Sequence, residues 1–182
     1  MSAPDRFSTD RLLVEDWQAV LQHPERASGF KSALAKALTP AITRYLPLSM
    51  QFNQATDSVE DWIITRQQEA HVLSVHLSAT GDFVGLVLLH EDRSNEASSF
   101  HIGYFFSEAN WGRGFATEVL GGLVNAFQNS RSTTLLAGVD VDNKASARVL
   151  EKVGFSLVPD RTEPNLFQHP RRSFVVDIDA RE

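Results

Sequence analysis

Two periodicities of hydrophobic residues divide the chain into strand-like and helix-like stretches. Alternation of apolar and polar residues is typical of strands that are buried on one face. We expect strands at residues 11–15, 71–79, 83–90, 100–106, 133–139, 155–158 and 173–178. Because the turn residues 80–82 follow the second strand and lead into the third, these two strands form a predicted hairpin.

Other stretches carry apolar residues every three to four positions, which is typical of helices. We expect helices at residues 32–38, 40–46, 58–70, 115–127 and 143–153. Thr39, Ser58 and Asn143 are suited to the N-cap positions of three of them. Gly29 and its polar neighbours predict a loop. The order of these elements predicts a single mixed α/β domain over residues 1–182.

The chain has no cysteine and a formal net charge of -6 over 182 residues. The lack of cysteine excludes disulfides, thiolate metal sites and a cysteine nucleophile. An acidic balance disfavours nucleic acid as a partner. No apolar run has the length of a membrane span, and the first ten residues lack a signal-peptide pattern, so we expect a cytoplasmic protein without a membrane partner. The six histidines show no metal-ligand spacing, and we expect no metal.

A glycine turn lies between the strand expected at residues 100–106 and the helix expected at residues 115–127. Its sequence over residues 111–118 is WGRGFATE. Glycines at the start of a helix expose backbone N–H groups at its positive end, which is a favourable place for phosphate. Arg113 adds a positive charge there. The turn lacks the ending of a Walker loop, and Thr117 stands where a dinucleotide fingerprint has glycine. The alternative is a turn that binds no ligand.

Several motifs occur in order along the chain. TDRLLV at residues 9–14 and TRYLP at residues 43–47 are followed by HIGY at 101–104, WGRGFATE at 111–118 and NKASARVLEKVGF at 143–155. Together they resemble the GNAT acetyltransferases, and more narrowly the ribosomal-protein N-acetyltransferase (RimJ/RimL-like) branch. The resemblance covers nearly the whole chain. It implies a central, mostly antiparallel twisted sheet with helices on both faces and a V-shaped opening between two central strands.

The resemblance also implies acetyl-CoA as the co-substrate. The backbone amides of the glycine turn would hold the CoA pyrophosphate with help from Arg113, and the end of the preceding strand would lie beside the pantetheine arm. The implied cofactor-binding residues are Phe105, Phe106, Trp111, Gly112, Arg113, Gly114, Phe115, Ala116, Thr117, Asn143 and Ser146. Asn143 and Ser146 lie three positions apart, so they share one edge of a helix start. Their alternatives are an ordinary N-cap and a small packing residue.

The candidate catalytic residues are Ser146, His101 and Asn143. Many GNAT enzymes have a tyrosine four residues before the Gly-Phe pair, to protonate the leaving thiolate, but this chain has Leu150 there. The RimL-like branch has the serine instead, so Ser146 inherits that candidate role. His101 stands where the branch usually has glutamate, and a histidine titrating near neutral pH can accept a proton from the amine.

Each of these assignments has an alternative. His101 can simply fill space on a half-buried strand, and His76 and His90 are weaker candidates for the base. Glu118 is expected to support the turn through the helix dipole rather than to perform chemistry.

The favoured function is transfer of an acetyl group to a primary amine, which is a protein N-terminus or a small amine, by direct attack in a ternary complex. Acceptor specificity is expected from residues 29–54, the hairpin turn near Gly81 and residues 164–172, because loops carry specificity on a fixed scaffold. The protein is expected to be a monomer or a homodimer. One alternative is a CoA-binding sensor or interaction module without turnover, and another is a purely structural domain that binds no CoA.

Overall fold

Eight strands form one sheet in the computed structural model, which describes residues 3–92, 98–128, 132–158 and 171–179. The strands are β1 (Arg6–Ser8), β2 (Leu12–Asp16), β3 (His71–Leu77), β4 (Phe83–Glu91), β5 (Ser99–Phe106), β6 (Thr133–Asp140), β7 (Ser156–Val158) and β8 (Arg171–Ile178). Their order is β1-β2-β3-β4-β5-β6-β8-β7. Neighbouring strands are antiparallel except β5 and β6, which are parallel.

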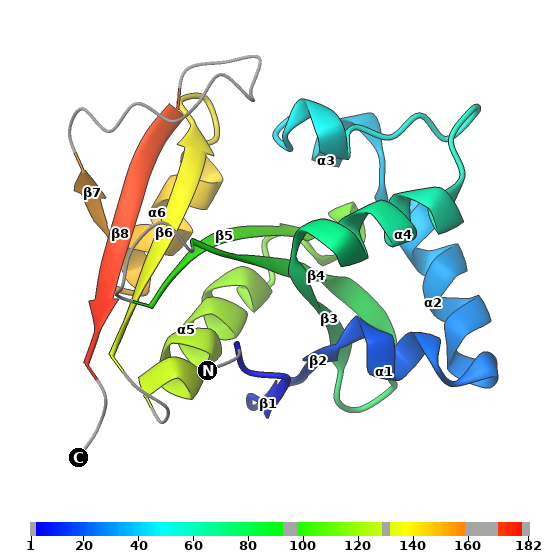
Figure 1. Ribbon diagram of the computed structural model, residues 1–182, viewed down its shortest axis with the longest axis horizontal. Coiled ribbons are helices and arrows are strands. Elements are labelled where there is room, and N and C mark those ends of the chain that lie inside the picture. The colour runs from blue at the N-terminus through cyan, green and yellow to red at the C-terminus, as the bar shows by residue number, and fades with distance from the viewer. Residues whose placement is uncertain (1–2, 93–97, 129–131, 159–170, 180–182) are drawn as a thin grey trace.

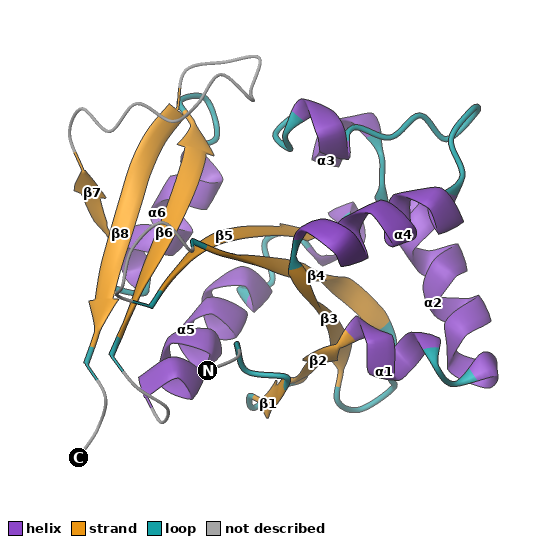
Figure 2. Ribbon diagram, viewed as in Figure 1, coloured by secondary structure: helices purple, strands orange, loops and turns teal. Residues whose placement is uncertain are grey.

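The helices occupy the intervals between these strands (Figures 1 and 2). They are α1 (Trp17–Leu21), α2 (Pro24–Ala37), α3 (Pro40–Thr43), α4 (Val59–Glu69), α5 (Phe115–Gln128) and α6 (Lys144–Lys152), with short 3₁₀ turns at Leu48–Met50 and Glu108–Asn110. Ser58 and Asn143 cap α4 and α6 with their side chains, as predicted. Among the described residues, no helix is long and apolar enough to cross a membrane.

Two hydrophobic cores lie on opposite faces of the sheet. One packs α5 and α6 against residues that alternate along the central strands, including Phe100, Ile102 and Phe106 of β5. The other packs α1, α2, α3 and α4 against the opposite face, which carries Phe105. Because successive side chains of a strand point to opposite faces, the alternation along β5 determines both cores. The mixed α/β class and the helices on both faces are therefore confirmed.

The structure corrects several local expectations. Gly29 was expected in a loop but lies inside α2, where Phe30, Leu34 and Ala37 face the core and hold the helix. A single exposed glycine costs a helix only about 1 kcal/mol, which such packing outweighs. The expected helix at residues 40–46 ends at Thr43. The strand β1 and the helix α1 have no counterpart among the predicted elements.

The sheet opens between β5 and β6. These strands pair only from Ser99 to His101 on β5, with residues 134–136 on β6. Beyond that point β6 continues in register with β8 along its whole length, from Thr133 to Asp140. The rest of β5 remains paired with β4 alone. Figure 1 shows β6 and β8 rising on one side of β5, with α3 and α4 on the other. The V-shaped opening expected between two central strands is present.

Candidate active site

A cleft of about 2110 Å³ follows the opening between β5 and β6. Small-molecule pockets usually have a volume of about 300–1,000 Å³, so this cleft has room for two substrates together. Its walls come from both sides of the opening. The predicted site residues on its surface are His101, Phe105, Phe106, Trp111, Gly112, Gly114, Phe115, Ala116, Thr117, Asn143 and Ser146.

The glycine turn opens onto this cleft. Gly112 and Gly114 have φ values of 73° and 80°, a left-handed conformation that favours glycine. The N–H of Glu118 donates to the carbonyl of Gly114 at 3.1 Å, so the N–H groups of residues 115–117 precede the first intrahelical hydrogen bond of α5. These N–H groups and the positive end of the helix dipole together form an anion site.

Two side chains flank the turn. Trp111 is 51% exposed, and its Nε1–H donates to the carbonyl of Phe106 at 2.7 Å, which ties the turn to the end of β5. The guanidinium of Arg113 lies 4.6 Å from the centre of the Phe115 ring and donates to Asn110 Oδ1 at 2.9 Å. Arg113 is not part of the cleft lining itself, but both of these partners are.

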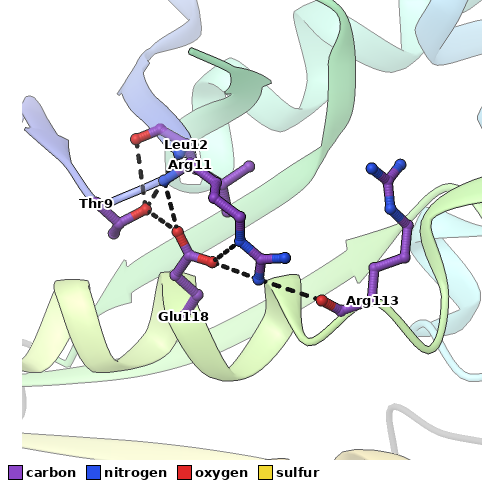
Figure 3. Close-up of polar contacts among 5 residues, drawn as sticks. All are labelled: Thr9, Arg11, Leu12, Arg113 and Glu118. Carbon is purple, nitrogen blue, oxygen red and sulfur yellow. Dashed lines mark hydrogen bonds and ion pairs between the residues drawn. The ribbon is translucent and has the colours of Figure 1, made fainter. Parts of the chain in front are cut away.

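A polar cluster joins the glycine turn to the start of the sheet (Figure 3). Glu118, in the first turn of α5, accepts hydrogen bonds from the Thr9 hydroxyl, from the Arg11 N–H at 2.9 Å and from Arg11 Nε at 2.7 Å. Arg11 Nη2 also donates to the carbonyl of Arg113 at 3.1 Å. Burial raises the pKa of Glu118, but the hydrogen bonds from Thr9 and Arg11 outweigh it and hold the pKa below its ordinary value. We name these residues (Thr9, Arg11 and Glu118) the turn tether.

A second polar pair lies where α6 meets β5. Asn143 Oδ1 accepts from the N–H of Ser146 at 3.1 Å, which fixes the start of α6. The hydroxyl of Ser146 lies 2.8 Å from the hydroxyl of Tyr104. Burial raises the pKa of Tyr104 to about 12. The phenol is therefore protonated at neutral pH.

Tyr104 was not among the site residues predicted from the sequence. The sequence signal that could have identified Tyr104 is its place on the apolar face of β5 with Phe100, Ile102 and Phe106. A tyrosine on such a face is buried, and a buried tyrosine hydroxyl usually has a hydrogen-bond partner. What the sequence could not show was that α6 brings Ser146 to this hydroxyl. The structure thus places a tyrosine beside the candidate serine, from the strand rather than from the helix.

His101 lines the cleft at the point where β5 and β6 stop pairing. It lies directly opposite His90 of β4 in the antiparallel register, and His90 also lines the cleft. His90 Nδ1 is 2.7 Å from the carbonyl of Glu69. By strand alternation, His101 and Tyr104 lie on opposite faces of β5, about 10 Å apart along the strand. An acid and a base at these positions would therefore approach a reacting group from two sides.

The third histidine considered, His76, is not at the cleft. It is buried between the rings of Phe30 and Phe83, and its Nδ1 lies 3.1 Å from the carbonyl of Gly81. Burial lowers the pKa of His76, so the ring is neutral at physiological pH. His76 belongs to the core between α2 and the sheet.

The cleft wall formed by α6 carries a row of positive charges. Lys144, Arg148 and Lys152 follow one another at a spacing of four, which places them on one edge of the helix. All three are exposed and line the cleft. Such a row beside the glycine turn favours an anionic ligand.

Three segments were expected to select the acceptor, and the structure distinguishes them. Residues 41–42 and 44–50 line the cleft. The turn near Gly81 lies outside its lining. Residues 164–170 lie outside the described part of the chain, but Arg171, at the start of β8, lines the cleft and contacts both of its walls.

The fold and the cleft together define an α/β protein in which two central strands separate beside a glycine-rich start of a helix. Residues 20–156 match the family described as acetyltransferase (GNAT) domain. The chain belongs to this family of acetyltransferases.

Several known proteins are similar to this chain. It is 30% identical over 100 residues to the uncharacterized protein YkkB of Bacillus subtilis, a match that spans 52% of this chain and 58% of YkkB. Its fold is similar to that of RimL, a ribosomal L7/L12 α-N-protein acetyltransferase solved with CoA, with a TM-score of 0.70, 18% identity and coverage of 98% of this chain and 99% of the other. RimJ of Mycobacterium smegmatis, solved with a CoA disulfide, gives a TM-score of 0.69 at 17% identity, with coverage of 96% and 88%. The fold thus agrees with the RimJ/RimL-like resemblance.

Proposed function

We propose that the protein is an acetyl-CoA-dependent N-acetyltransferase that acts on a primary amine. The observation that carries this proposal is the position of the Tyr104–Ser146 pair. It lies in the same cleft as the glycine turn and the open side of β5. One end of the cleft therefore suits a diphosphate, and a proton donor stands further along it.

The residues fit two parts of CoA, the phosphates and the pantetheine arm. The amides of the glycine turn and the positive row on α6 suit the phosphates. The carbonyl of Phe105 faces β4, because a Cβ at Gly85 would collide with it. By alternation, the backbone polar groups of Tyr104 and Phe106 face the opening, where β6 no longer pairs with them. The backbone N–H and carbonyl of Tyr104 and the backbone N–H of Phe106 are thus the groups that suit the amides of a pantetheine arm.

Acetyl-CoA supplies an activated thioester carbonyl when it is bound. The chain then has two tasks, which are to take a proton from the amine and to give one to sulfur. His101 is positioned at the apex of the opening to accept the amine proton. Ser146, whose hydroxyl is hydrogen-bonded with the neutral phenol of Tyr104, is positioned to donate a proton to the thiolate. Without a cysteine to form an acyl-enzyme, direct attack by the amine is the simpler scheme.

The proposed function is tested by the release of free thiol from acetyl-CoA in the presence of peptide N-termini, polyamines and aminoglycosides. Calorimetric titration with CoA, done in parallel, measures binding alone. Thiol release with one acceptor class establishes the enzyme and names that class. Tight CoA binding without release from any acceptor would favour a sensor, and no CoA binding would contradict both functions.

A further inference from the structure

The side chain of Arg171 connects the two walls of the cleft. Its Nη1 donates to the carbonyl of Gly138 on β6 at 2.8 Å, and its Nη2 donates to the carbonyl of Tyr45 at 2.8 Å. Arg171 pairs with Asp140 in the sheet, so its backbone belongs to the β6–β8 wall. Tyr45 follows α3 and belongs to the opposite wall. Figure 1 shows α3 facing the ends of β6 and β8 across β5.

The wall that contains Tyr45 has little regular structure, and side chains satisfy its carbonyl groups. Gln51 Nε2 donates to the carbonyls of Thr43 and Leu46 at 2.6 and 3.0 Å. Arg66 Nη1 donates to the carbonyl of Ser49 at 2.9 Å, and Trp62 Nε1 donates to the carbonyl of Met50 at 3.2 Å. Gln51, Trp62 and Arg66 all come from the same side of the cleft as the segment that they hold. In the described part of the chain, Arg171 bonds to a carbonyl of this wall from the other side of the cleft.

The segment held in this way lines the cleft with residues 41–42 and 44–50, and Leu48 is 51% exposed there. We call this the acceptor end of the cleft, because the segment is one of those expected to select the acceptor. Arginine is suited to such a bridge because its rigid, permanently charged fork donates in two directions at once. A hydrogen bond from a charged donor is also about twice as strong as a neutral one. At this end, the side chain of Arg171 therefore joins the two walls directly.

We propose that Arg171 is a specificity-determining residue, because its bridge sets the width of the acceptor end of the cleft. The bridge admits slender primary amines, such as a peptide N-terminus or a linear polyamine, and restricts bulky ones such as aminoglycosides. This role rests on the proposed function. The bond from Arg171 to Tyr45 joins two segments that were predicted separately from the sequence as determinants of the acceptor.

The test replaces Arg171 with Met, which keeps the apolar stem and removes both donors. The ratio of kcat/KM for an aminoglycoside to that for a small-residue peptide N-terminus should rise by about tenfold, the effect of losing one charged hydrogen bond. The Kd for CoA should change by less than about twofold, because the glycine turn is distant from the bridge. Arg172→Met is the matched control, since Arg172 is the exposed neighbour and should leave the ratio unchanged.

A second measurement does not depend on turnover. Hydrogen exchange of the amides in residues 44–51 should be about tenfold faster in Arg171→Met than in the unmodified protein or in Arg172→Met. Arg171→Lys keeps the charge but cannot hold both carbonyls in the same way, so it should resemble Arg171→Met.

The outcomes distinguish a failure of the specificity role of Arg171 from a failure of the proposed function. An active Arg171→Met variant with unchanged selectivity overturns the role of Arg171 alone. Unchanged exchange in residues 44–51, or full retention of selectivity in Arg171→Lys, also overturns it. An unmodified protein that turns over no amine overturns the proposed function, and the specificity role with it.

Discussion

The hydroxyl of Tyr104 lies 2.8 Å from the hydroxyl of Ser146, although the two residues are 42 positions apart. Tyr104 comes from β5 and Ser146 from the first turn of α6. The pair places a phenol at the start of α6, whereas Leu150 occupies the helical position at which the resemblance implies a tyrosine. If Ser146 protonates the leaving sulfur, Tyr104 is the residue that can orient and resupply its proton.

We expect Tyr104→Phe to lower kcat by about 10- to 100-fold, at the lower end of the effect of general acid catalysis, with little change in the Kd for CoA. Because burial raises the pKa of Tyr104 to about 12, the phenol remains protonated through the usual assay range. The loss should therefore be equal at pH 7 and pH 9 in steady-state assays. Tyr45→Phe is the control, since the Tyr45 hydroxyl accepts a hydrogen bond from its neighbour Arg44 at 2.8 Å. Equal kcat in Tyr104→Phe and the unmodified protein would remove Tyr104 from the mechanism.

The turn tether predicts a defect confined to the phosphate end of the cleft. Arg11→Gln or Glu118→Gln should raise the KM for acetyl-CoA by about tenfold, because the loss of a charged hydrogen bond frees the glycine turn. The KM for acetyl-pantetheine, which lacks the diphosphate, should not change. Arg6→Gln serves as a control on the adjoining strand β1. An equal defect with both thioesters would mean that the tether only stabilises the fold.

The tether also predicts a dependence of stability on pH. The pKa of Glu118 is below its ordinary value of 4.5 in the folded protein, so ionised Glu118 stabilises the folded state at neutral pH. That contribution is present above the unfolded pKa and is lost as the pH falls from about 4.5 through the lower folded pKa. In urea titrations, the difference in unfolding free energy between Glu118→Gln and the unmodified protein should shrink over this interval. A constant difference down to pH 3 would contradict the role of the charge.

Local features of the fold could be predicted from the sequence, and contacts between distant residues could not. Ser58 and Asn143 were identified as caps because a cap bonds to a residue three positions away. The pairs Tyr104–Ser146 and Arg11–Glu118 depend on how helices pack against strands, which no local pattern encodes. Strand β1 has only three residues, and its pairing with β2 provides no periodicity to detect.

The same distinction applies to the candidate site. The glycine turn could be identified as a candidate phosphate site because its glycines and the helix start lie within eight consecutive residues, and that role stays a prediction. The position of His101 on the cleft follows from the end of β5–β6 pairing, which is a tertiary property. Arg171 was included in a loop expected to select the acceptor, but its bond to Tyr45 spans 126 positions and is visible only in the structure.

The candidate base has its own test. His101→Gln keeps a polar side chain and removes the imidazole ring. If His101 accepts the amine proton, kcat should fall by about 100-fold. His90→Gln, which changes the cross-strand neighbour, is the matched control. If kcat of His101→Gln in steady-state assays were close to that of the unmodified protein, another group would be the base.

The glycine turn predicts a loss of binding without a loss of folding. Gly114 has a φ of 80°, and a Cβ there would lie 3.7 Å from Arg11 Nη2 at the start of α5. Gly114→Asp adds strain and a negative charge, so CoA affinity should fall by at least about 100-fold. Circular dichroism should report an intact fold. Calorimetry that gave unchanged CoA affinity would contradict the placement of the pyrophosphate at this turn.

Two adjacent glycines of α5 should respond in opposite directions to substitution by alanine. A Cβ at Gly121 would meet no atom within 4 Å, so Gly121→Ala should stabilise the protein by about 0.5–1 kcal/mol through helix propensity. A Cβ at Gly122 would lie 2.8 Å from side-chain atoms of both Phe7 and Thr9, so Gly122→Ala should destabilise it by about 1–3 kcal/mol. Because Thr9 belongs to the turn tether, Gly122→Ala should also raise the KM for acetyl-CoA, whereas Gly121→Ala should not. Urea denaturation and steady-state kinetics on the two variants measure both effects. Equal stability of the two variants would show that β1 does not pack against α5 as closely as the structure has it.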